Sequence, residues 1–244
     1  LVAQRVMGLA LGYEDLNDHD ELRHDVLFAA VVGKVQRLAG KSTLNRLELT
    51  RADASAASRY KKIVADEAAL DALFVEQFVA AQRRAPKRVV LDFDATDDPL
   101  HGRQEGRFFH GYYRCYCYLP LYIFAGEHLL CARLRGADAD GAAGAVDELA
   151  RIVGQLRRAW PAVQFIVRAD SGFCREALMA WCEANAVDYV LGLAKNARLL
   201  ERIAAEQQTA AAMHRTSGEA ARVFTEFEYC TRNNWSCARP RPST

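Results

Sequence analysis

A chain of 244 residues, 51% of them hydrophobic, can form one large domain or a domain with a small appendage. The 32 Lys and Arg balance 31 Asp and Glu, so any surface that binds nucleic acid must be local. The seven cysteines include no C-x-x-C pair, which favours reduced, buried thiols over a zinc ribbon, and no apolar run approaches the roughly 18 residues of a membrane span.

Residues 1–85 are predicted to be helical. Residues 1–12 are apolar and end at Gly12, and residues 17–40 carry acidic side chains early and basic ones late, before Gly40. That distribution suits the dipole of one helix at both of its ends. Residues 58–84 place five apolar side chains on one helical stripe, which predicts their inward face: Ile63, Leu70, Leu73, Phe74 and Phe78.

Pro86 ends this region, and short apolar strands follow. Strands are predicted over 87–94, 163–170, 187–194 and 222–232, with two or three antiparallel strands in the aromatic segment 109–135. Helices are predicted over 141–160, 171–185 and 195–215. The first of them has an apolar inward face of Val146, Leu149, Ile152, Val153 and Leu156. Helical crossovers between short apolar strands imply an α/β fold whose mixed sheet has a parallel part.

Two of the predicted strands end in aspartate, at Asp94 and at Asp170. Ligands of open α/β sheets bind beyond the carboxyl ends of strands, so the two side chains would meet if these strands are neighbours. Two unpaired, buried carboxylates would repel each other, and a bound divalent cation would relieve that repulsion. Oxygen ligands select Mg²⁺ or Mn²⁺, and such ions serve phosphoryl transfer.

Structural roles for these acids stay open beside the catalytic one. Asp170 stands before Ser171 and a predicted helix, so it can be a helix N-cap. Asp97 and Asp98 precede a proline and suit a turn.

A second enzyme class also fits the first acids. The stretch "DFDAT" resembles the D-x-D-x-T signature of haloacid-dehalogenase-type phosphatases, which would make Asp92 the nucleophile, Asp94 the acid and Lys195 the required lysine. No convincing acidic pair follows Lys195, however, and aromatic strands stand where that fold has a helix.

Four longer stretches, residues 8–25, 38–48, 90–122 and 168–199, together resemble bacterial insertion-sequence transposases of the IS1380 family, in the DDE group. The resemblance implies a partial ribonuclease-H-like core over residues 86–195, after a helical, DNA-binding region over 1–85. Residues 196–244 would begin an insertion and end in an aberrant tail.

The same resemblance implies the site residues. Two Asp and one Glu would bind Mg²⁺ or Mn²⁺, as two ions in an intact family member. Asp94 and Asp170 match the first two acids, as catalytic residues and metal ligands, and Asp92 and Asp97 would support them.

The third acid of the family belongs to a later helix that carries Tyr, Arg, Glu and Lys, and we find no such segment. Glu226 and Glu228 lie in a predicted strand, and the tail after Ser236 no longer resembles the family. We therefore expect a C-terminally truncated or frameshifted fragment with little or no activity. A non-catalytic DNA-binding remnant is the related alternative.

The resemblance implies double-stranded DNA as the partner, at transposon inverted repeats and at the target, with a possible homodimer of the intact protein. It also implies a place in the bacterial cytoplasm, at the nucleoid. Residues 34–62 hold eight Lys and Arg against two acidic residues, a local basic patch. The predicted DNA contacts are Lys34, Arg37, Lys41, Arg46, Arg168 and Lys195, whereas hydrogen-bonded structural roles are expected for His101 and His110.

Overall fold

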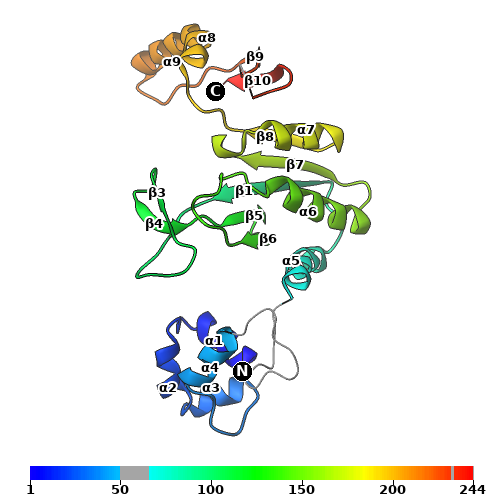
Figure 1. Ribbon diagram of the computed structural model, residues 1–244. Coiled ribbons are helices and arrows are strands. Elements are labelled where there is room, and N and C mark those ends of the chain that lie inside the picture. The colour runs from blue at the N-terminus through cyan, green and yellow to red at the C-terminus, as the bar shows by residue number, and fades with distance from the viewer. Residues whose placement is uncertain (50–65, 232–233, 244) are drawn as a thin grey trace. The chain divides into compact units, whose positions relative to one another are not determined.

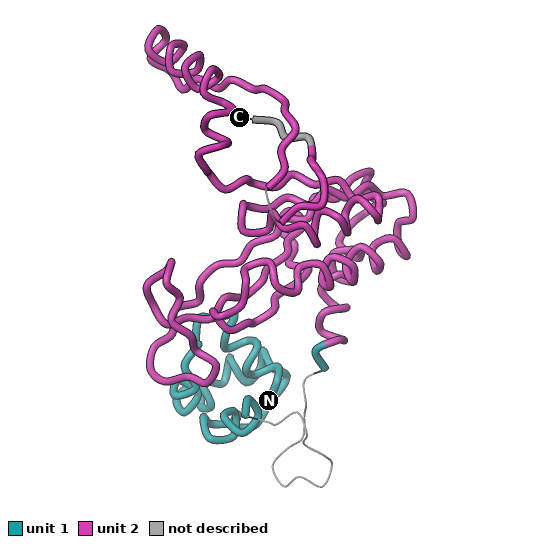
Figure 2. Tube along the Cα trace, turned by 45° about the horizontal axis from the view of Figure 1, so that its top comes forward, with its two compact units in different colours: residues 1–67 teal, residues 68–244 magenta. Residues whose placement is uncertain are grey.

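The computed structural model describes residues 1–49, 66–231 and 234–243, and it divides into two compact units, residues 1–67 and 68–244 (Figures 1 and 2). The division therefore lies at residue 67, whereas the sequence suggested 85. The helix that precedes Pro86 belongs with the sheet of the second unit.

The first unit consists of short helices: α1 (Val2–Ala10), η1 (Leu16–Asp18), α2 (His19–Leu22), α3 (Val26–Val31) and α4 (Lys41–Glu48). The prediction of one helix over 17–40 is wrong. Asp25 has extended backbone, and its carboxylate accepts hydrogen bonds from the amides of Leu27 and Phe28, so it starts a new helix as an N-cap. Gly33 then adopts a left-handed φ of 70°, just past the C-terminus of that helix.

A buried polar contact holds this unit together. The amide of Gln4 donates to the carbonyl of Ala39 at 2.7 Å and lies 3.3 Å from Nδ1 of His19. Both Gln4 and His19 are buried, at 3% and 0% exposure. Beside them, Leu22, Phe28, Ala29 and Leu38 form a small apolar core.

The second unit contains a five-stranded sheet in the order β6-β5-β1-β7-β8. Its strands are β1 (Arg88–Ala95), β5 (Leu121–Ala125), β6 (His128–Arg133), β7 (Gln164–Ala169) and β8 (Asp188–Leu191). Strands β1, β7 and β8 run parallel, whereas β5 pairs antiparallel with both β1 and β6. This order and these directions are those of a ribonuclease-H-like sheet, so the predicted α/β fold is confirmed.

One face of this sheet forms the core with α5 (Glu67–Ala81), α6 (Ala145–Ala159) and α7 (Glu176–Ala184). Successive side chains of a strand point to opposite faces, so Leu91 and Phe93 of β1 are buried while Asp92 between them is partly exposed. The inward face of α6 was predicted correctly, with Leu149, Ile152, Val153 and Leu156 buried and Val146 packed at the margin.

The inward face of α5 was predicted correctly only in part. Phe78 is buried and Phe74 partly buried, as predicted, but Leu70 and Leu73 are 49% and 43% exposed, and Asp71 and Val75 are buried in their place. Nη2 of Arg133, on β6, lies 2.6 Å from the carboxylate of Asp71, so a charged side chain can be buried on the same side of the helix as Val75 and Phe78. Ile63, the first residue of the predicted stripe, lies outside the described residues.

A small three-stranded sheet, in the order β2-β4-β3, follows β1: β2 (Asp98–Pro99), β3 (Phe108–His110) and β4 (Cys115–Tyr118). Figure 1 shows the arrowheads of β1 and β7 pointing the same way, toward the side where β3 and β4 stand. The aromatic segment thus forms four strands, β3 to β6, rather than the two or three expected.

The chain after β7 differs from the predicted elements in two places. The third apolar strand, β8, is an edge strand, and its Val190 is 60% exposed rather than buried. The helix predicted over 195–215 is divided at Ile203 into α8 (Ala197–Arg202) and α9 (Ala204–Ser217). No helix in the described ranges is long and apolar enough to cross a bilayer.

The C-terminal segment forms a hairpin of β9 (Thr225–Tyr229) and β10 (Arg239–Ser243). Arg239, in the part predicted as an aberrant tail, is 3% exposed. Its guanidinium pairs with Glu176 at 2.8 Å and with Glu183 at 2.5 Å, both on α7. We call these ion pairs of Arg239 with Glu176 and Glu183 the clasp; they hold the hairpin against α7.

Candidate functional site

The strands that end in Asp94 and Asp170 are neighbours in the sheet. β1 and β7 pair in parallel, and the last rung of the ladder joins Phe93 to Ala169. Asp94 and Asp170 are the next residue on each strand, and adjacent strands lie about 4.8 Å apart. Two carboxylates therefore leave the carboxyl edge of the sheet side by side.

Both carboxylates are exposed, whereas the sequence analysis expected them to be buried. The strand residues directly before them, Phe93 and Ala169, are still buried or partly buried, so the acids stand just past the edge of the core. Water can screen the repulsion between the two carboxylates there. The repulsion between buried carboxylates, from which the sequence analysis predicted a cation, therefore does not apply to this site.

Asp170 also caps a helical turn, as one alternative proposed. Its Oδ1 accepts a hydrogen bond from the amide of Gly172 at 2.8 Å, in the 3₁₀ turn η2 (Ser171–Phe173). The cap uses one oxygen and fixes the direction of the side chain. The second oxygen keeps its lone pairs, so capping and cation binding are compatible at this residue.

Asp92 differs from Asp94 in having a strong partner. Nε and Nη2 of Arg168 donate to its two oxygens at 2.5 Å and 2.8 Å, a bidentate pair across β1 and β7. No hydrogen bond or ion pair joins Asp94 to another residue in the described part of the chain. Asp92 therefore supports the strand pair, while Asp94 presents free oxygens.

A tyrosine that the sequence analysis did not select faces the same acids. Burial raises the pKa of Tyr113, and the negative charges of Asp97, Asp94 and Asp170 raise it further. Tyr113 lies in the turn between β3 and β4, and it packs, like Ala95 directly after Asp94, against the buried cluster of Cys117, Leu119 and Ala137. The only signal in the sequence was the aromatic run "HGYYR".

The structure places the other residues predicted near the acids as follows. Lys195 is exposed in the segment between β8 and α8, and His101 is exposed in the segment before β3. His110 is partly buried, with its ring 4.8 Å from that of Tyr113. Arg168, predicted to contact DNA, is exposed and pairs its guanidinium with Asp92.

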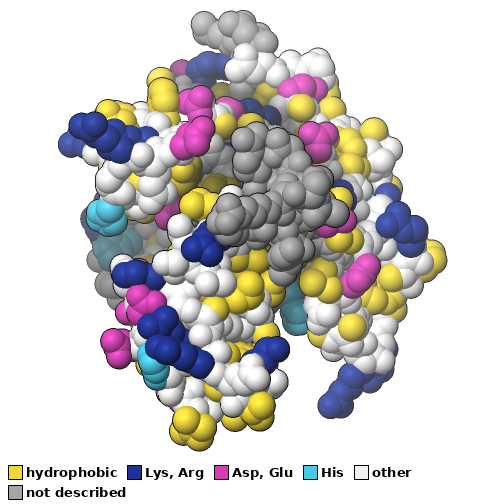
Figure 3. Space-filling model, turned by 60° about the horizontal axis from the view of Figure 1, so that its bottom comes forward, with side chains coloured by type: hydrophobic (Ala, Val, Ile, Leu, Met, Phe, Trp, Pro, Cys, Tyr) yellow, Lys and Arg dark blue, Asp and Glu magenta, His cyan; other side chains and the backbone are white. Residues whose placement is uncertain are grey.

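The predicted DNA contacts of the first unit lie on its surface: Lys34, Arg37, Lys41 and Arg46 are exposed. Lys41 pairs with Asp20 at 3.4 Å, and Nη2 of Arg37 lies 2.5 Å from the ring of His24. On the face shown in Figure 3, Lys and Arg side chains stand in separate groups with Asp and Glu nearby. Four further basic residues of the predicted patch, Arg51, Arg59, Lys61 and Lys62, lie outside the described residues.

The two aspartates suit a hard cation as part of its ligand set, since each offers carboxylate oxygen to solvent. Within residues 1–49, 66–231 and 234–243, no group of three His, Cys, Asp or Glu side chains gathers as a metal site. Among the described residues, the candidate site thus consists of the two aspartates at the strand ends.

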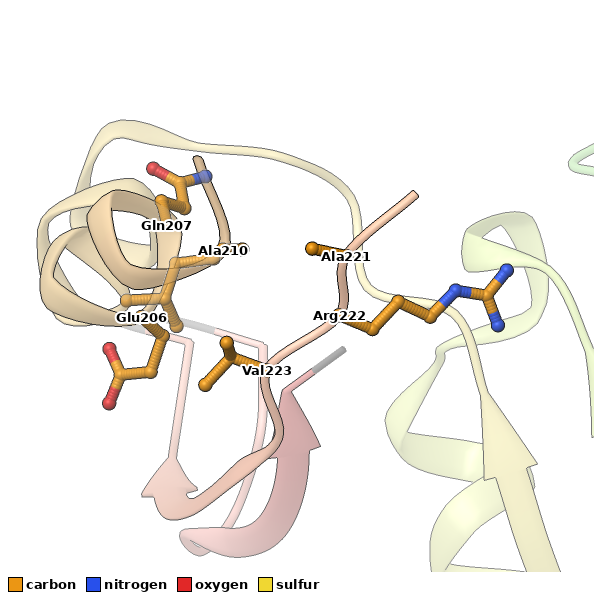
Figure 4. Close-up of a pocket in the computed structure, with 7 residues that line it drawn as sticks. Glu206, Gln207, Ala210, Ala221, Arg222 and Val223 are labelled. Atoms are coloured by element: carbon orange, nitrogen blue, oxygen red, sulfur yellow. The ribbon is translucent and has the colours of Figure 1, made fainter. Parts of the chain in front are cut away.

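A separate cavity of about 410 Å³ lies between α9 and the segment before β9. Figure 4 shows Ala210, Ala221 and Val223 facing this space, while Arg222 points away from it. Glu206 and Gln207 also line the cavity, which contains none of the predicted site residues.

Comparison with protein-family models matches residues 1–240 to the family described as transposase DDE domain group 1. The match extends past Ser236, into the segment predicted as an aberrant tail. No curated protein matches the chain.

Among solved structures, the catalytic domain of Mos1 mariner transposase is 11% identical with a TM-score of 0.32, covering 65% of this chain and 75% of that one. The Mos1 mariner paired-end complex with Mn is 12% identical with a TM-score of 0.31, covering 70% and 55%. The Mos1 paired-end complex with the left transposon end is 13% identical with a TM-score of 0.29, covering 90% and 66%. We base the fold on the strand order and directions of the sheet itself.

Proposed function

We propose, from the premise that this chain belongs to the transposase DDE domain group 1 family, that Asp94 and Asp170 are two of the acids of its DNA-cleaving centre. The observation that carries the proposal is the parallel register of β1 and β7, in which these acids are the next residues after paired Phe93 and Ala169. The finer assignment, to the IS1380 family of bacterial insertion sequences, is part of the same proposal.

The two aspartates would hold a divalent cation, Mg²⁺ or Mn²⁺. Such a cation supplies, when bound, activation of an attacking oxygen and stabilisation of a leaving oxygen at phosphorus. Asp94 offers both of its oxygens, and Asp170 offers the one that its helix cap leaves free. Asp97 follows Asp94 by three residues and would add negative charge to the site; its charge, like those of Asp94 and Asp170, raises the pKa of Tyr113.

Asp92 would act on the site of Asp94 and Asp170 indirectly, through Arg168. Arg168 lies two residues before Asp170 and points to the same face of the sheet. Because Asp92 accepts hydrogen bonds from two of the three guanidinium nitrogens, Nε and Nη2, this arginine is held on Asp92 and away from a direct pair with Asp94 or Asp170. The same pair disfavours the phosphatase alternative, since a nucleophilic Asp92 would have to be free of its arginine.

We propose further that the third acid of the family is missing from the described residues, so that this chain alone cleaves DNA poorly. Glu226 and Glu228 lie on β9, which pairs with β10 in a separate two-stranded sheet. The natural partners would be double-stranded DNA at transposon ends and at the target, held in part by the first unit, with a homodimer of the intact protein, at the nucleoid in the bacterial cytoplasm.

Manganese binding tests the proposed centre directly. Titration of Mn²⁺ into the full chain, followed by electron paramagnetic resonance, should show a site that Asp94→Asn and Asp170→Asn each abolish. Glu226→Gln is the matched control and should leave the affinity unchanged. Unchanged Mn²⁺ affinity in Asp94→Asn would refute the assignment.

Nicking of a supercoiled plasmid in Mg²⁺ tests the proposed loss of activity. We expect the rate to equal that of Asp94→Ala, because two acids alone hold the cation loosely. Cleavage well above that of Asp94→Ala would show that the third acid is present after all.

A further inference from the structure

We propose that a row of three aromatic rings beside the candidate centre, Tyr112, Tyr113 and His110, binds an unpaired stretch of DNA by stacking a base on Tyr112. The proposal deepens the proposed function, on which it rests, by naming the form of DNA that this site accepts. We refer to these three side chains as the tyrosine row.

Tyr112 is the outer end of the row, and it is 84% exposed. A tyrosine normally buries most of its ring, because the ring is largely apolar. The one ring contact of Tyr112 in the described residues is with Tyr113, in a T-shaped arrangement with a centroid distance of 5.0 Å and an angle of 86°. Most of the ring is therefore open to a flat partner.

Tyr113 is the middle member of the row, and it connects the row to the acids. Its ring lies 4.8 Å from that of His110, and it packs beside the buried cluster of Cys117, Leu119 and Ala137. Ala95, the residue after Asp94, packs against the same cluster, so the row lies close to the strand end that carries Asp94. Burial, and then the charges of Asp97, Asp94 and Asp170, raise the pKa of Tyr113, which agrees with this placement. A nucleotide whose phosphate sits at the acids would have a neighbouring base near the row.

The turn that carries the row is held in a fixed shape. The amide of Arg114 donates to the carbonyl of His110 at 2.8 Å, and Arg114 adopts a left-handed φ of 57°. The flanking strands pair antiparallel, with His110 opposite Cys115. The open ring of Tyr112 is thus presented in an ordered turn, which lowers the entropy cost of stacking.

The segment that carries the row is itself basic, whereas the acids that act on Tyr113, Asp94, Asp97 and Asp170, belong to other segments. Residues 101–118 contain Arg103, Arg107 and Arg114 but a single acidic residue, Glu105. Strand-binding proteins combine basic side chains, which contact phosphates, with aromatic rings on which bases stack. A duplex keeps its bases inside, so only an unpaired or flipped base can use Tyr112 in this way.

A single-strand binding assay tests the proposal without requiring catalysis. We would measure the fluorescence anisotropy of a labelled 12-nucleotide thymidine strand and of a 12-base-pair duplex with the full chain, in EDTA. Tyr112→Ala should weaken single-strand binding about tenfold and leave duplex binding within twofold, whereas Tyr112→Phe should bind like the parent.

Phe109→Ala is the matched control. Phe109 is 48% exposed and pairs with Tyr116, so it lies on the face of the small sheet opposite to His110. It should change single-strand binding less than twofold. Equal losses in Phe109→Ala and Tyr112→Ala, or no loss in Tyr112→Ala, would overturn the proposal.

Two further outcomes separate this proposal from its alternatives. A dimer that Tyr112→Ala dissociates in sedimentation, with single-strand binding intact, would overturn it in favour of self-association. Loss of single-strand binding in Tyr112→Ala with Mn²⁺ binding intact supports it. If Asp94→Asn leaves Mn²⁺ affinity unchanged while Tyr112→Ala still weakens strand binding, the proposed metal centre fails and the tyrosine row stands.

Discussion

Gly192 lies directly against the turn that carries Asp170. A Cβ built at Gly192 would stand 2.8 Å from the amide nitrogen of Ser171 and 3.0 Å from the carbonyl carbon of Asp170. The amide of Gly192 donates to the carbonyl of Ala169 at 2.9 Å. The backbone directly after β8 thus lies against the backbone of the Asp170 turn, and only a residue without a side chain allows this approach.

Gly192→Ala should therefore displace Asp170. Since both contacts are with backbone, neither can move aside as a flexible side chain would, and the turn or the end of β8 must shift. We expect at least a severalfold weaker Mn²⁺ affinity and a lower unfolding temperature, measured on the same preparation. Gly154→Ala is the control: no neighbouring atom lies within 4 Å of its Cβ, and alanine in that helix should stabilise the protein by about 0.5–1 kcal/mol. Unchanged Mn²⁺ binding in Gly192→Ala would contradict this role.

Removing the charge of Asp92 should weaken cation binding without unfolding the protein. In Asp92→Asn the Arg168 guanidinium loses its bidentate partner and can turn toward Asp94 or Asp170 on the same face. We expect a severalfold lower Mn²⁺ affinity and an unchanged unfolding temperature, because exposed pairs contribute little to stability. Restoration of the affinity in Asp92→Asn with Arg168→Ala would identify the freed guanidinium as the cause.

Asp188→Asn is the matched control for this charge removal. Asp188 is an exposed acid on β8, and its register partner on β7 is Ile166. Its removal should not change Mn²⁺ affinity. An equal loss of Mn²⁺ affinity in Asp92→Asn and Asp188→Asn would show that the loss comes from the change in overall negative charge and not from the freed Arg168.

The strand that carries Asp94 could be predicted because its signals are local. An apolar run that ends in an acid specifies both a strand and the position of a carboxylate at its end, and the run before Asp170 repeats the pattern. Helical crossovers then restrict the topology to few solutions. The register that sets Phe93 beside Ala169 is the part that only the folded sheet supplies.

The failures have tertiary causes. Asp71 looked like a solvent-facing residue of α5, but its partner Arg133 lies 62 residues away. No sequence motif marks Tyr113. Its place near Asp94 depends on the small sheet β2-β4-β3, whose buried cluster contacts both Tyr113 and Ala95. The helix start at Asp25 has a local cause instead. An aspartate within a predicted helix favours an N-cap, but the charge pattern of residues 17–40 was given more weight.

Acid should release the C-terminal hairpin from α7. Arg239, with Ser236, lowers the pKa of Glu176 to about 2, and Arg239 also lowers the pKa of Glu183. A carboxyl whose folded pKa is depressed contributes stability that is present above its ordinary pKa of 4.5 and lost as the pH falls toward 2.

The fluorescence of Trp235 should report this release, because its ring is buried and lies 6.0 Å from the Arg239 guanidinium. We expect its emission to change between about pH 4.5 and 2, and Glu176→Gln should move the transition to higher pH. Glu201→Gln, at an exposed position of α8, should leave it in place. A transition that Glu176→Gln does not move would show that the clasp does not hold the hairpin.

Mild acid should loosen the first unit, through His19. Burial, and then the charge of Arg5, lower the pKa of His19, so its neutral form is the one that the fold accepts. Nδ1 faces the amide of Gln4, and Nε2 is buried with no hydrogen-bond partner in the described residues. Stability from this group is therefore full above the ordinary pKa of 6.5 and declines as the pH falls below it.

Hydrogen exchange measured by mass spectrometry, with labelling times corrected for the intrinsic effect of pH, can follow this loss. Peptides from residues 1–31 should exchange faster at pH 5.5 than at pH 7.5 in the parent protein and in His24→Gln, whose histidine is exposed. In His19→Gln the exchange should not depend on pH in this range, because glutamine cannot take up a proton. A pH dependence that persists in His19→Gln would assign the effect to another group, since only the buried imidazole must lose its contact with Gln4 when it becomes charged.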